Sequence, residues 1–150
     1  MKRFSFPLRP LAVIRAHREL RAREAFAAAV HAYVQTEERL AQCRARVAEL
    51  GAMLFAGRRE RYFAADAAGL FRVYRAESHS ELEAERAVIE ARALMNQRRA
   101  EYLEADRRLK IVQRLEEKAR TRHRAETLRA EQAEHDEFAG FRSAQRAALS

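Results

Sequence analysis

The stretch from residue 88 to residue 112, VIEARALMNQRRAEYLEADRRLKIV, carries the pattern that decides the fold. Four of its large side chains recur at intervals of seven residues: Val88, Met95, Tyr102 and Leu109. The positions between them in the repeat are held by Ala91, Arg98, Ala105, Val112 and, farther on, Ala119. A seven-residue repeat of this kind is typical of a helix that packs along a second helix. The stretch therefore predicts a long helix with a continuous seam.

An earlier part of the chain has a similar repeat, which can be followed in steps of four and three. Its positions are Phe26, Val30, Tyr33, Glu37, Leu40, Arg44, Val47, Gly51 and Leu54. This predicts a heptad seam with polar interruptions. Pro10 suits a first helical turn, because its missing N–H would have no partner there. We expect a first helix over about residues 10–56.

The connection between the two helices is predicted at about residues 57–65, because Gly51, Gly57 and Gly69 cluster around it. Asp66 can cap a second helix over about residues 66–140, followed by a short C-terminal tail. Residues 78–81, Ser-His-Ser-Glu, also read as a capping box and offer a later start. We favour the early start, with Ser78 and Ser80 as a weak point.

The composition supports the same fold class. The chain is 35% charged and 48% hydrophobic, with much of the apolar content in Ala, and it has only four Gly, two Pro and no Trp. This mixture is typical of long helices. We predict an all-α protein, a single domain over residues 1–150, folded as an elongated antiparallel two-helix coiled coil whose second helix is longer and overhangs the first.

Charge and cysteine content narrow the class further. The formal net charge is +8, and residues 1–24 alone contribute +5, which suits nucleic acid, an acidic membrane surface or an acidic protein. Cys43 is the single cysteine, so an internal disulfide is excluded. The N-terminus lacks the features of a secretory signal and no apolar run spans a membrane, so we expect a cytoplasmic protein.

The residues EQAEHDEF, 131–138, place a histidine among carboxylates and raise the question of a metal or acid–base site. Glu131 and His135 share a helix face, but no second pair of ligands completes a metal site. Asp136 and Glu137 are adjacent, so their side chains diverge and cannot flank one bond. No nucleotide-binding or nucleophile motif occurs either. We predict neither enzymatic activity nor a cofactor, and we keep a metal-binding helical hairpin only as a weaker alternative.

Two binding hypotheses remain. Basic clusters such as Arg107-Arg108 alternate with acids, which favours a solvated face, although a basic coiled coil that binds nucleic acid stays an alternative. Aromatic residues gather near the connection between the helices: Tyr62, Phe63, Phe71 and Tyr74. They predict either a small cap on the hairpin end or a docking patch.

Two segments resemble a known family. The chain opens with FSFPLRPLAVIRAHRE, residues 4–19, and its second predicted helix carries RRLKIVQRLEEKARTRHRAETLRAEQAEHDEFA, residues 107–139, which closes on an Asp-Glu doublet. These segments resemble the FliJ family of flagellar type III export proteins, which is related to the YscO-like secretion proteins. The resemblance covers nearly the whole chain.

The resemblance implies a non-enzymatic stalk or adaptor in the cytoplasm, peripherally associated with the inner face of the membrane at the flagellar base. It would insert into the hexameric export ATPase and contact the membrane protein of the export gate and the export chaperones, with no small-molecule substrate. The family's opening and terminal doublet correspond to Phe4, Phe6, Leu8, Asp136, Glu137 and Phe138. With Phe71 and Tyr74 of the aromatic patch, these are the predicted partner-binding residues.

Overall fold

The computed structural model describes residues 3–60 and 64–149, with side chains omitted for residues 59 and 60. It contains two α-helices, α1 (Arg9–Glu60, 52 residues) and α2 (Ala64–Ala148, 85 residues), and no strand in the described ranges. The predicted all-α hairpin with a longer second helix is confirmed. The chain divides into two compact units, a terminal unit of residues 1–19 and 105–150 and a hairpin unit of residues 20–104.

The helix bounds differ from the predicted ones at three ends. α1 continues to Glu60 instead of ending near residue 56, and α2 begins at Ala64 and ends at Ala148. Gly51, Gly57 and Gly69 therefore lie inside helices. A glycine costs a helix interior only about 1 kcal/mol relative to Ala, which packing between the helices offsets. α2 also runs without a break through Ser78 and Ser80, so the early start is the observed one.

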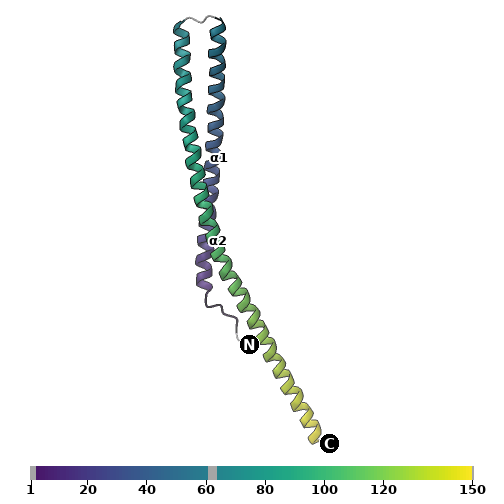
Figure 1. The fold of residues 1–150 in the computed structure, drawn as a ribbon. Helices are drawn as coiled ribbons and strands as arrows, with labels where there is room; N and C mark the ends of the chain where they lie inside the picture. The colour runs from purple at the N-terminus through teal and green to yellow at the C-terminus, as the bar shows by residue number, and fades with distance from the viewer. Residues whose placement is uncertain (1–2, 61–63, 150) are drawn as a thin grey trace. The chain divides into compact units, whose positions relative to one another are not determined.

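In the hairpin unit the two helices run antiparallel, side by side (Figure 1). Arg92 of α2 lies beside Tyr33 of α1, whereas Glu77, earlier in α2, lies beside Arg46, later in α1. The buried cluster between the helices consists of Leu40, Cys43, Ala84 and Val88, with Tyr33 packed against it. Such a seam removes one apolar stripe of each helix from water, which stabilises the pair far more than intrinsic helix propensity does.

The seam of α2 follows the predicted register. Buried and half-buried positions alternate in steps of three and four at Val88, Ala91, Met95, Arg98, Tyr102, Ala105, Leu109, Val112, Glu116, Ala119 and His123. Every position predicted from the opening stretch is among them. Val112, which is 1% exposed, is the most completely buried of the core hydrophobic residues in the described ranges.

The seam of α1 follows a different register from the predicted one at every second position. Covered positions recur in steps of three and four at Ala22, Phe26, Ala29, Tyr33, Thr36, Leu40, Cys43, Val47, Leu50, Leu54 and Gly57, and the predicted Val30 and Gly51 beside them are also half-buried. Glu37 and Arg44, which we predicted in the seam, are exposed beside it. The prediction chose the wrong neighbour because a step of four and a step of three from Phe26 both reach apolar residues, and the small side chains Ala29 and Cys43 gave a weak signal.

In the corrected register the charged residues Glu37 and Arg44 leave the seam and form ion pairs beside it. Arg44 binds Glu85 at 2.9 Å and lies 3.5 Å from Glu81, and the hydrogen bond to Glu85 raises the pKa of Arg44 above its usual value. Arg92 donates to the Tyr33 hydroxyl at 3.0 Å, which likewise raises the pKa of Arg92. Charged side chains beside a coiled-coil seam help to fix its register and the orientation of its helices.

In the terminal unit, an N-terminal segment and the first turns of α1 lie against α2. The backbone N–H of Arg9 donates to the carbonyl of Phe6 at 3.1 Å, which closes a turn before α1. Arg15 donates to the backbone carbonyl of Arg108 at 3.0 Å. This bond and the buried Val112 place the start of α1 along the part of α2 that follows residue 105. No helix in the described part of the chain is long and apolar enough to cross a membrane.

Candidate partner-binding site

The N-terminal members of the predicted site are held by the fold of the terminal unit. The Phe4 ring packs edge-on against His123, with 5.5 Å between ring centroids, and the guanidinium of Arg120 lies over the same ring at 5.5 Å. Phe6 is buried, whereas Leu8 is partly exposed. Phe4 and Phe6 therefore anchor the N-terminal segment, and Leu8 is the member of the three whose side chain is most available at the surface.

The C-terminal members lie on a part of α2 that carries no seam. Every residue from 132 to 149 is exposed, including Asp136 and Glu137. Phe138 and Phe141 expose 63% and 66% of their surface, and Arg142 lies over the Phe138 ring at 5.6 Å. Two exposed phenylalanines three residues apart on one helix form a small apolar surface that a partner can cover. Phe141 was not predicted, although its three-residue spacing from Phe138 was a signal in the sequence.

The aromatic pair of the hairpin unit lies beside a hollow between the helices. Phe71 and Tyr74 are stacked, with ring centroids 6.4 Å apart. Phe71 is half exposed, and a Cβ built on Gly51 would lie 3.7 Å from the Tyr74 ring, so Tyr74 packs against α1. Tyr62 and Phe63, the other predicted members of this patch, lie outside the described residues.

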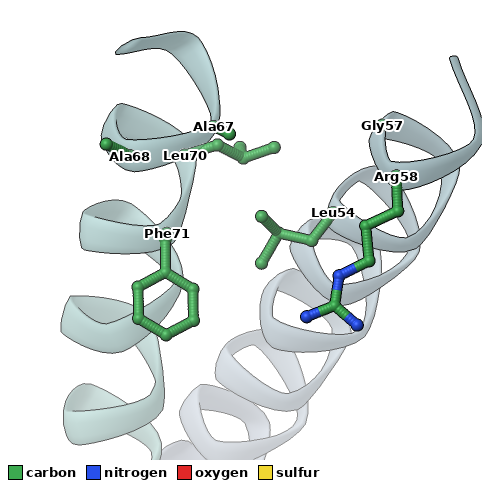
Figure 2. A pocket seen from close by; sticks show the side chains of 7 residues that line it. All are labelled: Leu54, Gly57, Arg58, Ala67, Ala68, Leu70 and Phe71. Carbon is green, nitrogen blue, oxygen red and sulfur yellow. The ribbon is translucent and has the colours of Figure 1, made fainter. Parts of the chain in front are cut away.

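The hollow has a volume of about 460 Å³ and is mainly apolar. Its lining comes from both helices: Leu54, Gly57 and Arg58 of α1, and Ala67, Ala68, Leu70 and Phe71 of α2. Figure 2 shows Leu54 and Leu70 projecting toward each other from opposite helices, with the Phe71 ring below Leu70. Because small residues occupy much of the lining, the helices leave an apolar recess that a partner side chain can enter.

The chemical groups of these sites suit binding to another protein. In the described ranges no group of three or more His, Cys, Asp or Glu side chains is arranged to hold a metal ion. Cys43 is buried in the seam as a free thiol. The candidate sites present exposed aromatic rings, carboxylates and an apolar recess. These features are common in surfaces that bind other proteins.

These features define a class: an antiparallel two-helix hairpin with one helix continued beyond its seam and exposed aromatic side chains on that continuation. The family model described as "Flagellar FliJ protein" matches residues 4–148, nearly the whole chain. The chain therefore belongs to the FliJ family, a family of flagellar protein export components. Neither the curated proteins nor the solved structures gave a match to this chain.

Proposed function

We propose that this protein is a non-enzymatic stalk of the flagellar type III export apparatus, which inserts into the centre of the hexameric export ATPase and promotes its assembly or activity. It works in the cytoplasm at the flagellar base, and it also contacts the export gate and export chaperones. The observation that carries the proposal is the exposed continuation of α2, residues 132–149, in a chain of this family.

The physical mechanism is differential binding. A single helix that enters a ring of six nominally identical subunits contacts them unequally. It thereby favours ring assembly and particular nucleotide states in the subunits it touches. The exposed rings of Phe138 and Phe141 supply apolar contacts, while Asp136 and Glu137 supply charges that orient the helix.

The apolar recess of the hairpin unit supports a second contact, with the export gate or a chaperone. The recess and the half-exposed Phe71 ring accept an apolar side chain, and Arg58 at the rim attracts an acidic neighbour. This contact uses residues of the hairpin unit, whereas the ring contact uses residues of the terminal unit. The two contacts can therefore be removed by separate substitutions.

The test is ATP turnover by the organism's own export ATPase, with and without this protein, at fixed salt, together with sizing of the ATPase. We expect stimulation and a larger hexamer fraction. The variant Phe138→Ala/Phe141→Ala should weaken binding to the ATPase roughly tenfold or more while its helicity is unchanged. Phe55→Ala is the matched control, because Phe55 is equally exposed, at 67%, but lies in the hairpin unit.

Charge reversal gives an independent test of the same contact. Asp136→Lys/Glu137→Lys should weaken ring binding, whereas Glu90→Lys, at an exposed position of the hairpin unit, should not. A folded protein that leaves ATP turnover and hexamer content unchanged would contradict the stalk role. Equal losses in the site variants and in the controls would contradict the assignment of the contact to residues 132–149.

A further inference from the structure

The positive charge of the chain is concentrated in the terminal unit. Residues 1–19 and 105–150 carry 16 Lys and Arg against nine Asp and Glu, a net charge of +7. Residues 20–104 carry 14 against 13 and are nearly neutral. The basic character of the protein is thus a property of one unit, and neither the seam nor the proposed ring contact accounts for it.

Over residues 105–124 of the terminal unit, the acids of α2 lie in the seam or on one flank of the helix. In residues 105–124 they are Asp106, Glu116 and Glu117. Asp106 binds Lys110 at 2.7 Å and Glu116 binds Arg120 at 3.1 Å, so these two cations are paired with acids. In the heptad set by the observed seam, Asp106, Lys110, Glu117 and Arg120 occupy the e and b positions, on one flank of the helix.

The other flank and the outer surface of α2 carry no acid over the same residues. Their cations follow one another along the helix as Arg107, Arg114, Lys118 and Arg122. None of these four forms an ion pair within the described part of the chain. Arg108, on the same flank, accepts a hydrogen bond from Arg15 at its backbone carbonyl. This surface is called the basic face below. It has positive charge that the fold leaves available for an anionic partner.

Aliphatic side chains lie among these cations. Ile111 and Leu115 of α2 are each 44% exposed and stand four residues apart, on the flank that also carries Lys118 and Arg122. In an antiparallel pair the g positions of both helices border the same side of the seam. Leu11 of α1 is a g position, and Ile14, three residues on at a c position, lies on the same flank of α1. Ile14 is 49% exposed. The pocket lined by Arg39, Arg46 and Ser80 shows the same pairing of g positions in the hairpin unit.

We infer that the basic face is a docking site for an anionic phospholipid surface. Lys and Arg attract the headgroups, while Ile14, Ile111 and Leu115 enter the boundary between headgroups and acyl chains. The combination distinguishes this partner from nucleic acid. A surface that binds single strands presents aromatic rings for stacking, and none lies on this flank, while phosphates of a duplex would leave the isoleucines in water.

The test is cosedimentation of the full chain with phosphatidylcholine vesicles, with and without phosphatidylglycerol, at low and moderate salt. We expect binding only to the vesicles with phosphatidylglycerol, and weaker binding as salt increases. The variant Arg114→Gln/Lys118→Gln/Arg122→Gln should lower the partition coefficient roughly a hundredfold. Ile111→Asn/Leu115→Asn should lower it as well, because the apolar contribution is lost.

Two controls separate the site from net charge and from folding. Arg72→Gln/Arg86→Gln/Arg99→Gln removes the same charge from exposed positions of the hairpin unit and should retain vesicle binding. Ile89→Asn removes an exposed isoleucine from that unit and should also retain it. Helicity and the melting temperature are measured for every variant.

Equal loss in the two triple variants would show attraction by net charge alone and overturn the inference. Absence of vesicle binding, with duplex DNA bound through the same three cations, would also overturn it and assign the basic face to nucleic acid. Loss of ATPase stimulation in the triple variant without any vesicle binding would assign the face to the ring. The Phe138→Ala/Phe141→Ala variant should still bind vesicles, so the failure of this inference and the failure of the stalk proposal are distinguishable.

Discussion

The seam-bearing part of α2 and its last turns are built from the same residue types but differ in burial. From Ala67 to His123, a covered residue recurs every three or four positions. From residue 132 to residue 149, every side chain is exposed, including Phe138 and Phe141. Helix formation is common to both regions, and packing is confined to the first. Apolar residues that form no seam are therefore better candidates for partner contacts than those that do.

The largest effect is expected where the seam is most completely covered. Val112→Asp places a charge at a position that is 1% exposed and should destabilise the terminal unit by about 3 kcal/mol or more. Ile111→Asp, at the exposed neighbouring position, should cost less than about 1 kcal/mol. Chemical denaturation followed by circular dichroism measures both. Equal stability losses would contradict the observed register of α2.

A smaller effect tests the corrected register of α1. Leu40→Ala removes a side chain from the buried cluster and should cost about 2 kcal/mol or more. Val34→Ala changes an exposed position of the same helix and should cost less than about 0.5 kcal/mol. Thermal melts of the two variants give the comparison. A larger loss of stability for Val34→Ala than for Leu40→Ala would show that the seam of α1 lies on the face of Val34 and not on the face of Leu40.

Removing the last turns of α2 should have little effect on stability. A chain truncated after residue 131 loses the helical signal of the removed segment but should melt within about 2 °C of the full chain, because no seam residue is lost. Amide hydrogen exchange of the full chain should be faster in residues 132–149 than around Val112. Protection of that segment equal to the protection around Val112 would show that it is packed in the isolated protein.

The smallest effect is a pH dependence at the surface of α2. A hydrogen bond from Arg98 at 2.8 Å lowers the pKa of Glu101 below its usual value. A carboxyl whose pKa is lower in the folded state stabilises the fold above its unfolded pKa, and this contribution is lost as the pH falls through the lowered folded pKa. We expect Glu101→Gln to reduce slightly the loss of stability in acid. If Glu101→Gln and the unmodified chain lose stability identically as the pH falls, the ion pair of Arg98 and Glu101 does not contribute to the stability of α2.

Much of the fold followed from periodicity, and the failures have identifiable causes. The α2 register was predictable because Val88, Met95, Tyr102 and Leu109 are large and regularly spaced. The α1 register was predicted wrongly because seam positions such as Ala29 and Cys43 are small, whereas the neighbouring Val30 is a stronger apolar signal. The connection was predicted too long because glycine disfavours a helix by an amount that packing outweighs.

The predicted partner-binding residues divide in a way that the sequence did not show. Phe4 and Phe6 pack within the terminal unit, while Phe138 is exposed, although all three look alike as aromatic residues near a chain end. His123, the ring partner of Phe4, had no signal in the sequence, because it lies more than a hundred residues away. Their roles in binding stay predictions.

The sequence by itself determined the two long helices, the seam of α2 and the membership of the FliJ family, because these depend on local propensity, on regular spacing and on motifs within one helix. The tertiary structure decided which residues contact one another. It determined which face of α1 enters the seam, which cations are neutralised by ion pairs and which aromatic rings remain exposed. Those outcomes depend on contacts between residues far apart in the chain. Only packing of the two helices brings such residues together.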